Sequence, residues 1–195
     1  MLKVHINNIE VEVKEGTTIL EAAKKAGFTI PTLCHHEDLK PHGSCGICVV
    51  EVEGFPAMKR ACMTEILNGW KVHTNSVQVR SVRKEILELI LSKHEMDCPT
   101  CIKNNNCELQ RLAATLGITN LKYKNNFKRR KIDDTSLSIV RNPNKCILCG
   151  RCIQVCTEIQ TVNALALSSR GFDTTITDAF DEGLGNSPCV NCGQC

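Results

Sequence analysis

The sequence is poor in aromatic residues and has no long apolar run. Five Phe, one Tyr and one Trp make up 4% of the 195 residues, which argues against a large aromatic core. No stretch approaches the roughly 18 consecutive apolar residues of a membrane span. The strand-like start, residues 1–7, lacks the apolar segment of a secretory signal peptide. No glycine-rich phosphate loop follows a predicted strand. These absences predict a cytoplasmic protein without a membrane span.

Cysteine, in contrast, is abundant: the chain has 14, gathered in separate groups. Thiols of a protein that is not secreted stay reduced, so metal or redox use is favoured over disulfides. Small modules, each held together by a metal site, fit this distribution better than one large core. The formal net charge of +3 says little about partners. An iron–sulfur centre with four thiolate ligands would add roughly two negative charges.

The one basic patch is the run Lys128–Lys131. No aromatic side chains that could stack on bases interleave it, so we do not expect a nucleic-acid partner. We interpret the run as the solvated face of a linker. Docking, or neutralisation of a cluster's charge, is the alternative.

Residues 1–76 are predicted to form a small β-rich module. Lys3–Ile6 and Glu10–Val13 alternate apolar and polar residues and are separated by two asparagines, which indicates a hairpin. A helix is expected over residues 19–26, followed later by a strand over residues 49–53. Two hairpins around one helix describe a β-grasp ferredoxin module, so the expected class of the chain is α+β.

Four cysteines lie on the connecting loops of this module, separated by ten, two and thirteen residues: Cys34, Cys45, Cys48 and Cys62. They resemble the [2Fe-2S] ligands of the domain that opens iron-only hydrogenases, and those of the large peripheral subunit of respiratory complex I. The plant-type ferredoxin spacing, with four residues between the first two cysteines, is not present. A four-thiolate zinc site is the alternative, although only Cys45 and Cys48 are as close as in a zinc knuckle.

Residues 77–93 are predicted to form an amphipathic helix that opens a second module, residues 77–117. Its apolar face is expected to hold Val79, Val82, Ile86, Leu89 and Ile90, with Arg80, Arg83, Lys84, Glu85 and Glu88 largely elsewhere. A second, shorter helix is expected over residues 108–116, ended by a glycine.

Between these two helices lies a set of one histidine and three cysteines: His94, Cys98, Cys101 and Cys107. It resembles the histidine-ligated [4Fe-4S] motif of the same two families. A neutral imidazole in place of a thiolate removes one negative charge and should raise the reduction potential, as in Rieske centres. A zinc knuckle with these ligands is the alternative. The other histidines are interpreted as ordinary surface or hydrogen-bonded residues: His5, His35, His36, His42 and His73.

Residues 118–138 show no periodicity and are predicted to form a linker, with residues 138–141 as a candidate short strand.

Residues 139–195 resemble a two-cluster bacterial ferredoxin with a longer insertion between its halves. By the crossed ligation of such ferredoxins, one [4Fe-4S] cluster takes Cys146, Cys149 and Cys152, and the other takes Cys156, Cys189, Cys192 and Cys195. The fourth ligand of the first cluster would fall at about position 199. We therefore expect the sequence to be part of a longer chain; an incomplete cluster is the alternative.

The expected cofactors are one [2Fe-2S] and three [4Fe-4S] clusters, and the sequence shows no catalytic pocket. Several closely packed redox centres suit the passage of single electrons from one to the next. Arg170–Thr174, Ala179–Asp181 and the last cysteine run resemble the electron-bifurcating, NAD(P)-linked multisubunit iron-only hydrogenases. The resemblance implies the relay region of a hydrogenase catalytic subunit from an anaerobe, with the hydrogen-forming H-cluster beyond Cys195.

The same resemblance implies partner subunits that carry FMN, NAD(P) and further iron–sulfur centres, with ferredoxin as the other electron carrier. The alternatives are the relay of an NAD-dependent formate dehydrogenase, a complex I-like subunit, or a non-catalytic carrier or adaptor subunit. An interaction module held together by structural zinc sites is a more distant alternative. Cysteine motifs for a six-iron centre after Cys195 would indicate the hydrogenase, and a molybdopterin-binding domain the formate dehydrogenase.

Overall fold

The computed structural model describes residues 1–123 and 128–195; part of the predicted linker, residues 124–127, lies outside the described residues. The amino-terminal part is a mixed five-stranded sheet in the order β2-β1-β5-β3-β4. Its strands are β1 (Leu2–Ile6), β2 (Ile9–Val13), β3 (Val49–Val52), β4 (Lys59–Arg60) and β5 (Lys71–His73). β1 and β5 run parallel, and the other neighbours are antiparallel. A mixed sheet with a few helices agrees with the expected α+β class.

Local sequence signals explain the start of this module. Asn7 and Asn8 both have positive φ, 49° and 71°, as the tight turn between β1 and β2 requires. Helix α1 (Ile19–Lys25) begins with a capping box, in which Thr18 and Glu21 satisfy each other's backbone N–H groups. Its buried residues Ile19, Ala22 and Ala23 belong to the largest apolar core of the described residues.

Helix α2 (Val77–Leu91) packs against β3, and the faces predicted for it were partly wrong. Leu89 is 46% exposed, whereas Arg83 and Glu88 are buried. Leu87 and Leu91 are buried in their place. The face of the helix that is buried is therefore rotated from the predicted one. The buried arginine is tolerated because its guanidinium donates a hydrogen bond to the Val49 carbonyl at 2.7 Å.

The second module continues from α2. A 3₁₀ turn, η1 (Cys98–Thr100), leads to helix α3 (Glu108–Thr115). α3 places Leu109 in a second core with Leu33, Ile47, Leu87 and Leu91. Because Leu33 and Ile47 come from the cysteine-bearing loops of the first module, this core joins the two modules.

The third module has little regular structure. Its helical elements are α4 (Arg151–Gln154), the π-helical turn η3 (Val155–Ile159) and the 3₁₀ turns η2 (Pro143–Lys145), η4 (Gly171–Asp173), η5 (Ala179–Asp181) and η6 (Leu184–Asn186). A two-stranded sheet pairs β6 (Ala166–Ser168) with β7 (Thr175–Thr177). Leu165, Ile176 and Leu184 form a small core.

The candidate strand over residues 138–141 is not formed; Arg141 makes only a single bridge with Asp133. Pairing stops there because the chain turns away after Asp133, whose carboxylate accepts hydrogen bonds from Thr135.

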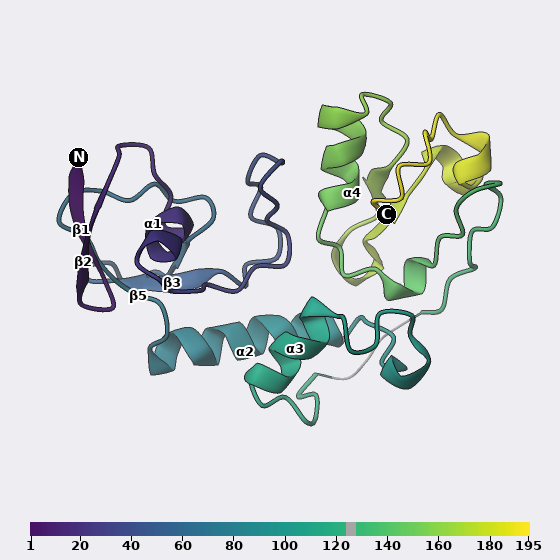
Figure 1. The fold of residues 1–195 in the computed structure, drawn as a ribbon. Coiled ribbons are helices and arrows are strands. Elements are labelled where there is room, and N and C mark those ends of the chain that lie inside the picture. The colour runs from purple at the N-terminus through teal and green to yellow at the C-terminus, as the bar shows by residue number, and fades with distance from the viewer. Residues whose placement is uncertain (124–127) are drawn as a thin grey trace.

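In Figure 1 the first and third modules lie at opposite ends, and α2 runs beneath the sheet toward the third module. Within residues 1–123 and 128–195, no helix has the length and apolar character needed to cross a bilayer.

Candidate metal centres

The four predicted [2Fe-2S] ligands come together from the loops after α1, before β3 and after β4. Cys34, Cys48 and Cys62 are buried and Cys45 is half-buried. The Cys48 and Cys62 sulfurs are 3.4 Å apart. Hydrogen bonds from Cys45 and Cys62 hold the pKa of the Cys34 thiol below its ordinary value, and a hydrogen bond from Cys62 lowers the pKa of Cys48 to about 6. Lowered pKa values favour the thiolate, the form that binds metals, at Cys34 and Cys48, while the same hydrogen bonds raise the pKa of the Cys45 and Cys62 thiols.

The loop before Cys45 depends on a glycine. Gly43 has φ +62°, and a Cβ built on it would lie 2.1 Å from the Met63 sulfur. Arg60 donates to the Gly43 carbonyl at 2.8 Å, which ties the loop to β4. A side chain at position 43 would therefore displace either Met63 or the loop that carries the ligand.

The four predicted ligands of the second module, His94, Cys98, Cys101 and Cys107, all line one cavity of about 80 Å³. Burial, followed by the nearby Lys145 charge, lowers the pKa of His94, so its imidazole is neutral near pH 7. Neutral imidazole is the form that ligates metals. The buried His94 Nδ1 has no hydrogen-bond partner in the described structure. A site made of one neutral imidazole and three thiols suits a thiophilic metal centre.

In the third module the cysteines of the two runs meet. One small cavity is lined by Cys152, Cys156, Cys189, Cys192 and Cys195. Cys156 is 7% exposed, and its sulfur accepts a hydrogen bond from the Ala164 N–H at 3.2 Å. This cavity therefore brings together all four ligands predicted for the second [4Fe-4S] cluster of this module. Cys152, a predicted ligand of the other cluster, lines the same cavity.

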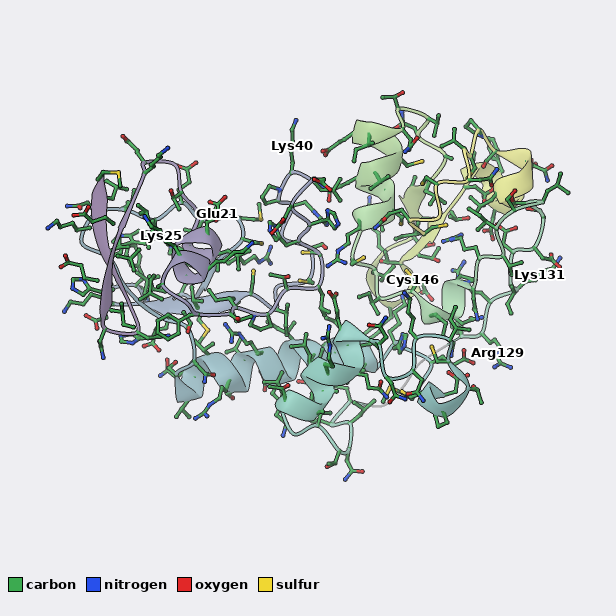
Figure 2. All side chains as sticks on the ribbon, viewed as in Figure 1. Glu21, Lys25, Lys40, Arg129, Lys131 and Cys146 are labelled. Carbon is green, nitrogen blue, oxygen red and sulfur yellow. The ribbon has the colours of Figure 1, made fainter. Side chains whose placement is uncertain are left out.

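The remaining ligands of the third module lie next to that cavity. Burial raises the pKa of the Cys146 thiol, and burial also raises the pKa of Cys152, to about 12. The Leu148 N–H donates to the Cys146 sulfur at 3.3 Å. Figure 2 shows Cys146 on the side of the third module that faces the second, with Arg129 and Lys131 at the outer edge.

No three His, Cys, Asp or Glu side chains of residues 1–123 and 128–195 are arranged to hold a single metal ion. The thiols of the first module instead approach one another in pairs, Cys34 with Cys45 and with Cys62, and Cys48 with Cys62. An iron–sulfur cluster contains two or more irons, so thiols that approach one another in pairs can bind different irons of one cluster.

Two contacts that the sequence interpretation missed join the first module to the third. His42 Nε2 lies 2.8 Å from the Cys149 carbonyl oxygen, and the Ser44 hydroxyl donates to the same oxygen at 3.0 Å. Gly150 has φ +77°, and a Cβ there would lie 3.0 Å from His42 Nε2, so the close approach depends on glycine. His42 was interpreted as an ordinary histidine. No signal in the sequence relates it to a cysteine 107 residues away.

A cluster of charges joins the second module to the third. Lys145, directly before Cys146, pairs with Glu95 at 3.0 Å and with Asp97, the neighbours of His94 and Cys98. Arg129 pairs with Glu95 at 2.5 Å, and Lys128 pairs with Asp173 at 3.1 Å. The basic run is exposed, as expected for a solvated face, but two of its side chains make ion pairs.

Comparisons with protein families assign iron–sulfur domains to most of the chain. Residues 1–77 match the 2Fe-2S iron-sulfur cluster binding domain, and residues 83–122 match the NADH-ubiquinone oxidoreductase-G iron-sulfur binding region. Residues 139–157 match the 4Fe-4S binding domain. The prediction of [2Fe-2S]- and [4Fe-4S]-binding domains is confirmed; the number of clusters and their individual ligands stay predictions.

Curated relatives match the whole chain. It is 41% identical to NADP-reducing hydrogenase subunit HndD of Solidesulfovibrio fructosivorans, 36% to an NADH-quinone oxidoreductase subunit of Rhizobium meliloti and 39% to NADPH-Fe(3+) oxidoreductase subunit alpha of Geobacter sulfurreducens. The chain spans 34% of the first and 23% of each of the other two. Since the NADH-quinone oxidoreductase protein matches throughout, the paired cysteine runs do not separate hydrogenases from NADH-quinone oxidoreductases.

A solved structure also matches almost the whole chain. A chain from the crystal structure of NAD⁺-reducing [NiFe]-hydrogenase in the H₂-reduced state superposes with a TM-score of 0.89 at 30% identity. The match covers 97% of this chain and 80% of that one. The relatives are thus oxidoreductase proteins that use NAD(H), NADP(H) or hydrogen, according to their names.

Proposed function

Because the chain belongs to the iron–sulfur protein family that includes a component of NADH-quinone oxidoreductase and a chain of NAD⁺-reducing [NiFe]-hydrogenase, we propose that it is the electron relay of an NAD(P)-linked iron-only hydrogenase catalytic subunit. The observation that carries the proposal is the cavity lined by His94, Cys98, Cys101 and Cys107. Four ligands from residues 94–107 line one cavity there. The 41% identity to an NADP-reducing hydrogenase subunit favours the hydrogenase over the other relatives.

In this proposal each set of ligands holds one cluster. The first module, a β-grasp domain, would hold the [2Fe-2S] cluster through Cys34, Cys45, Cys48 and Cys62. The second module would hold the histidine-ligated [4Fe-4S] cluster. The third would hold two further [4Fe-4S] clusters by crossed ligation. The clusters, when bound, accept and release single electrons. The chain's own residues keep the imidazole neutral, exclude water by burial, and donate backbone N–H groups to the sulfurs of Cys146 and Cys156.

The contacts between modules suggest how the clusters are ordered. The loop of Cys146, Cys149 and Cys152 receives His42 and Ser44 from the first module and faces Glu95 and Asp97 of the second. Cys45, Cys107 and Ile147 pack against one shared apolar core. We therefore propose that electrons from both the [2Fe-2S] cluster and the histidine-ligated cluster converge on this loop. They would leave through the cluster of Cys156 toward an H-cluster beyond Cys195.

Partners follow from the same proposal. Flavin- and NAD(P)-binding subunits and a small iron–sulfur subunit would exchange electrons with this region, and ferredoxin would be the second carrier of a bifurcating complex in the cytoplasm.

Metal analysis tests the relay. The loaded full-length protein is expected to contain about 14 irons in this region if all four clusters are complete, with EPR signals of one [2Fe-2S] and several [4Fe-4S] centres on reduction. Zinc with almost no iron would contradict the relay and support a zinc-stapled module.

A second candidate is a relay subunit with no catalytic domain. It is favoured by the [NiFe]-hydrogenase structure, in which this chain spans 80% of the matched chain. Sequencing the gene beyond Cys195 separates the candidates. Cysteine motifs for a six-iron centre support the iron-only hydrogenase, whereas a stop codon supports the relay subunit.

Replacing His42 by alanine is expected to weaken the junction between the first and third modules. The change removes one hydrogen bond to the Cys149 carbonyl, with an effect of about 1 kcal/mol. Electron transfer from the [2Fe-2S] centre should become several-fold slower at unchanged iron content, as measured by freeze-quench EPR. His73→Ala is the matched control, because the His73 ring pairs with Glu53 inside the first module. Equal slowing in both variants would contradict a role for the junction.

A further inference from the structure

Arg83 is a buried cation without an anionic partner in the described structure. It lies on α2 and is 5% exposed. One of its terminal nitrogens donates to the Val49 carbonyl at 2.7 Å, while its Nε is buried without a hydrogen-bond partner. Among the described residues its guanidinium forms no ion pair with Asp or Glu.

An unpaired buried charge is strongly unfavourable, so such a group normally has a counter-charge. Burial lowers the pKa of Arg83 to about 10, and the charge of Cys48 opposes that shift. The guanidinium therefore stays protonated at neutral pH.

Helix α2 lies directly against the loop that carries this ligand. A Cβ on Gly46 would lie 3.6 Å from Ile86 Cδ1, and the Arg83 hydrogen bond ends on Val49, the residue after Cys48. The second module thus places one positive charge beside the backbone that follows Cys48.

We propose that Arg83 is the counter-charge of the [2Fe-2S] cluster and raises its reduction potential. The inference rests on the proposed cluster at Cys34, Cys45, Cys48 and Cys62. When one electron passes from a reductant to this cluster, no bond forms or breaks and the negative charge increases by one. A fixed cation nearby stabilises the reduced state more than the oxidised state. Arg83 is a positioning residue in this role, because its charge acts on the cluster through space.

The test is a redox titration of the full-length, iron-loaded protein with dithionite, followed through the [2Fe-2S] EPR signal. Arg83→Gln keeps a donor for the Val49 carbonyl and removes the charge. The ratio of reduced to oxidised [2Fe-2S] at a fixed potential is expected to fall about tenfold, which is about 59 mV for one electron. Arg80→Gln is the matched control: it removes the same charge one turn earlier, from an exposed position, and should change the ratio less than about twofold.

Each outcome decides the inference. A ratio unchanged in Arg83→Gln, or changed equally in Arg80→Gln, would overturn it while the [2Fe-2S] signal itself upholds the proposed relay. If Arg83→Gln does not load the cluster, Arg83→Lys decides: loading with less than about a threefold change supports a counter-charge. Loss of the cluster in Arg83→Lys as well would assign Arg83 a packing role. Absence of a [2Fe-2S] signal in the unmodified protein would refute the proposed function instead.

Discussion

Chelating iron from the loaded protein is expected to unfold residues 139–195 while the amino-terminal sheet persists. The third module buries only Leu165, Ile176 and Leu184 in its core, each contributing about 1.5–3 kcal/mol. Structural zinc contributes about 10–16 kcal/mol in zinc-finger peptides, and a cluster contribution of that order would exceed what this small core supplies. The first module has a much larger apolar core that includes the side chains of β1, β3, β5 and α1.

Amide hydrogen exchange before and after chelation measures this difference. Protection in residues 139–195 should fall by more than about a hundredfold, which corresponds to a loss of more than about 2.7 kcal/mol, whereas β1 and β3 should change by less than about tenfold. Helix α2 should behave like the sheet, because it packs on β3. Reconstitution with iron and sulfide should restore protection. A uniform loss of protection across all three modules would show that the sheet also depends on its cluster.

Replacing Cys156 by serine is expected to abolish one [4Fe-4S] cluster and spare the other in the third module. Cys156 is almost fully buried and lines one cavity with Cys189, Cys192 and Cys195, so its replacement leaves this set one thiolate short. Iron content should fall from about 14 to about 10 per chain, because one four-iron cluster is lost.

The matched control is Cys149→Ser, at the first run's second cysteine. Under crossed ligation it should diminish a different EPR signal from the one lost in Cys156→Ser. If both substitutions remove the same signal, the crossed assignment is wrong and the four cysteines of residues 146–156 act together. Iron analysis and EPR of the reduced full-length protein provide both readouts.

The elements that depend on local chemistry were predicted well from the sequence. The first turn, with its two asparagines, and helix α1 are short segments whose backbone preferences act within a few residues. The candidate strand at residues 138–141 failed because strand pairing needs a partner, and Asp133 offers only one paired residue. The exposed Leu89 and the buried Arg83 show the same limit for α2. Which face of this helix is buried depends on the elements that pack against it, and the periodicity of its own sequence does not define that face.

By itself, the sequence predicted which residues hold metal, since the spacing of cysteines along a short loop decides whether their thiolates can reach one cluster. Only the tertiary structure decided which of these loops are neighbours. His42 and Ser44 reach Cys149 across more than 100 residues, and Arg83 reaches the strand that follows Cys48. Such contacts result from the packing of separate modules on shared apolar cores, which spacing along the chain does not encode.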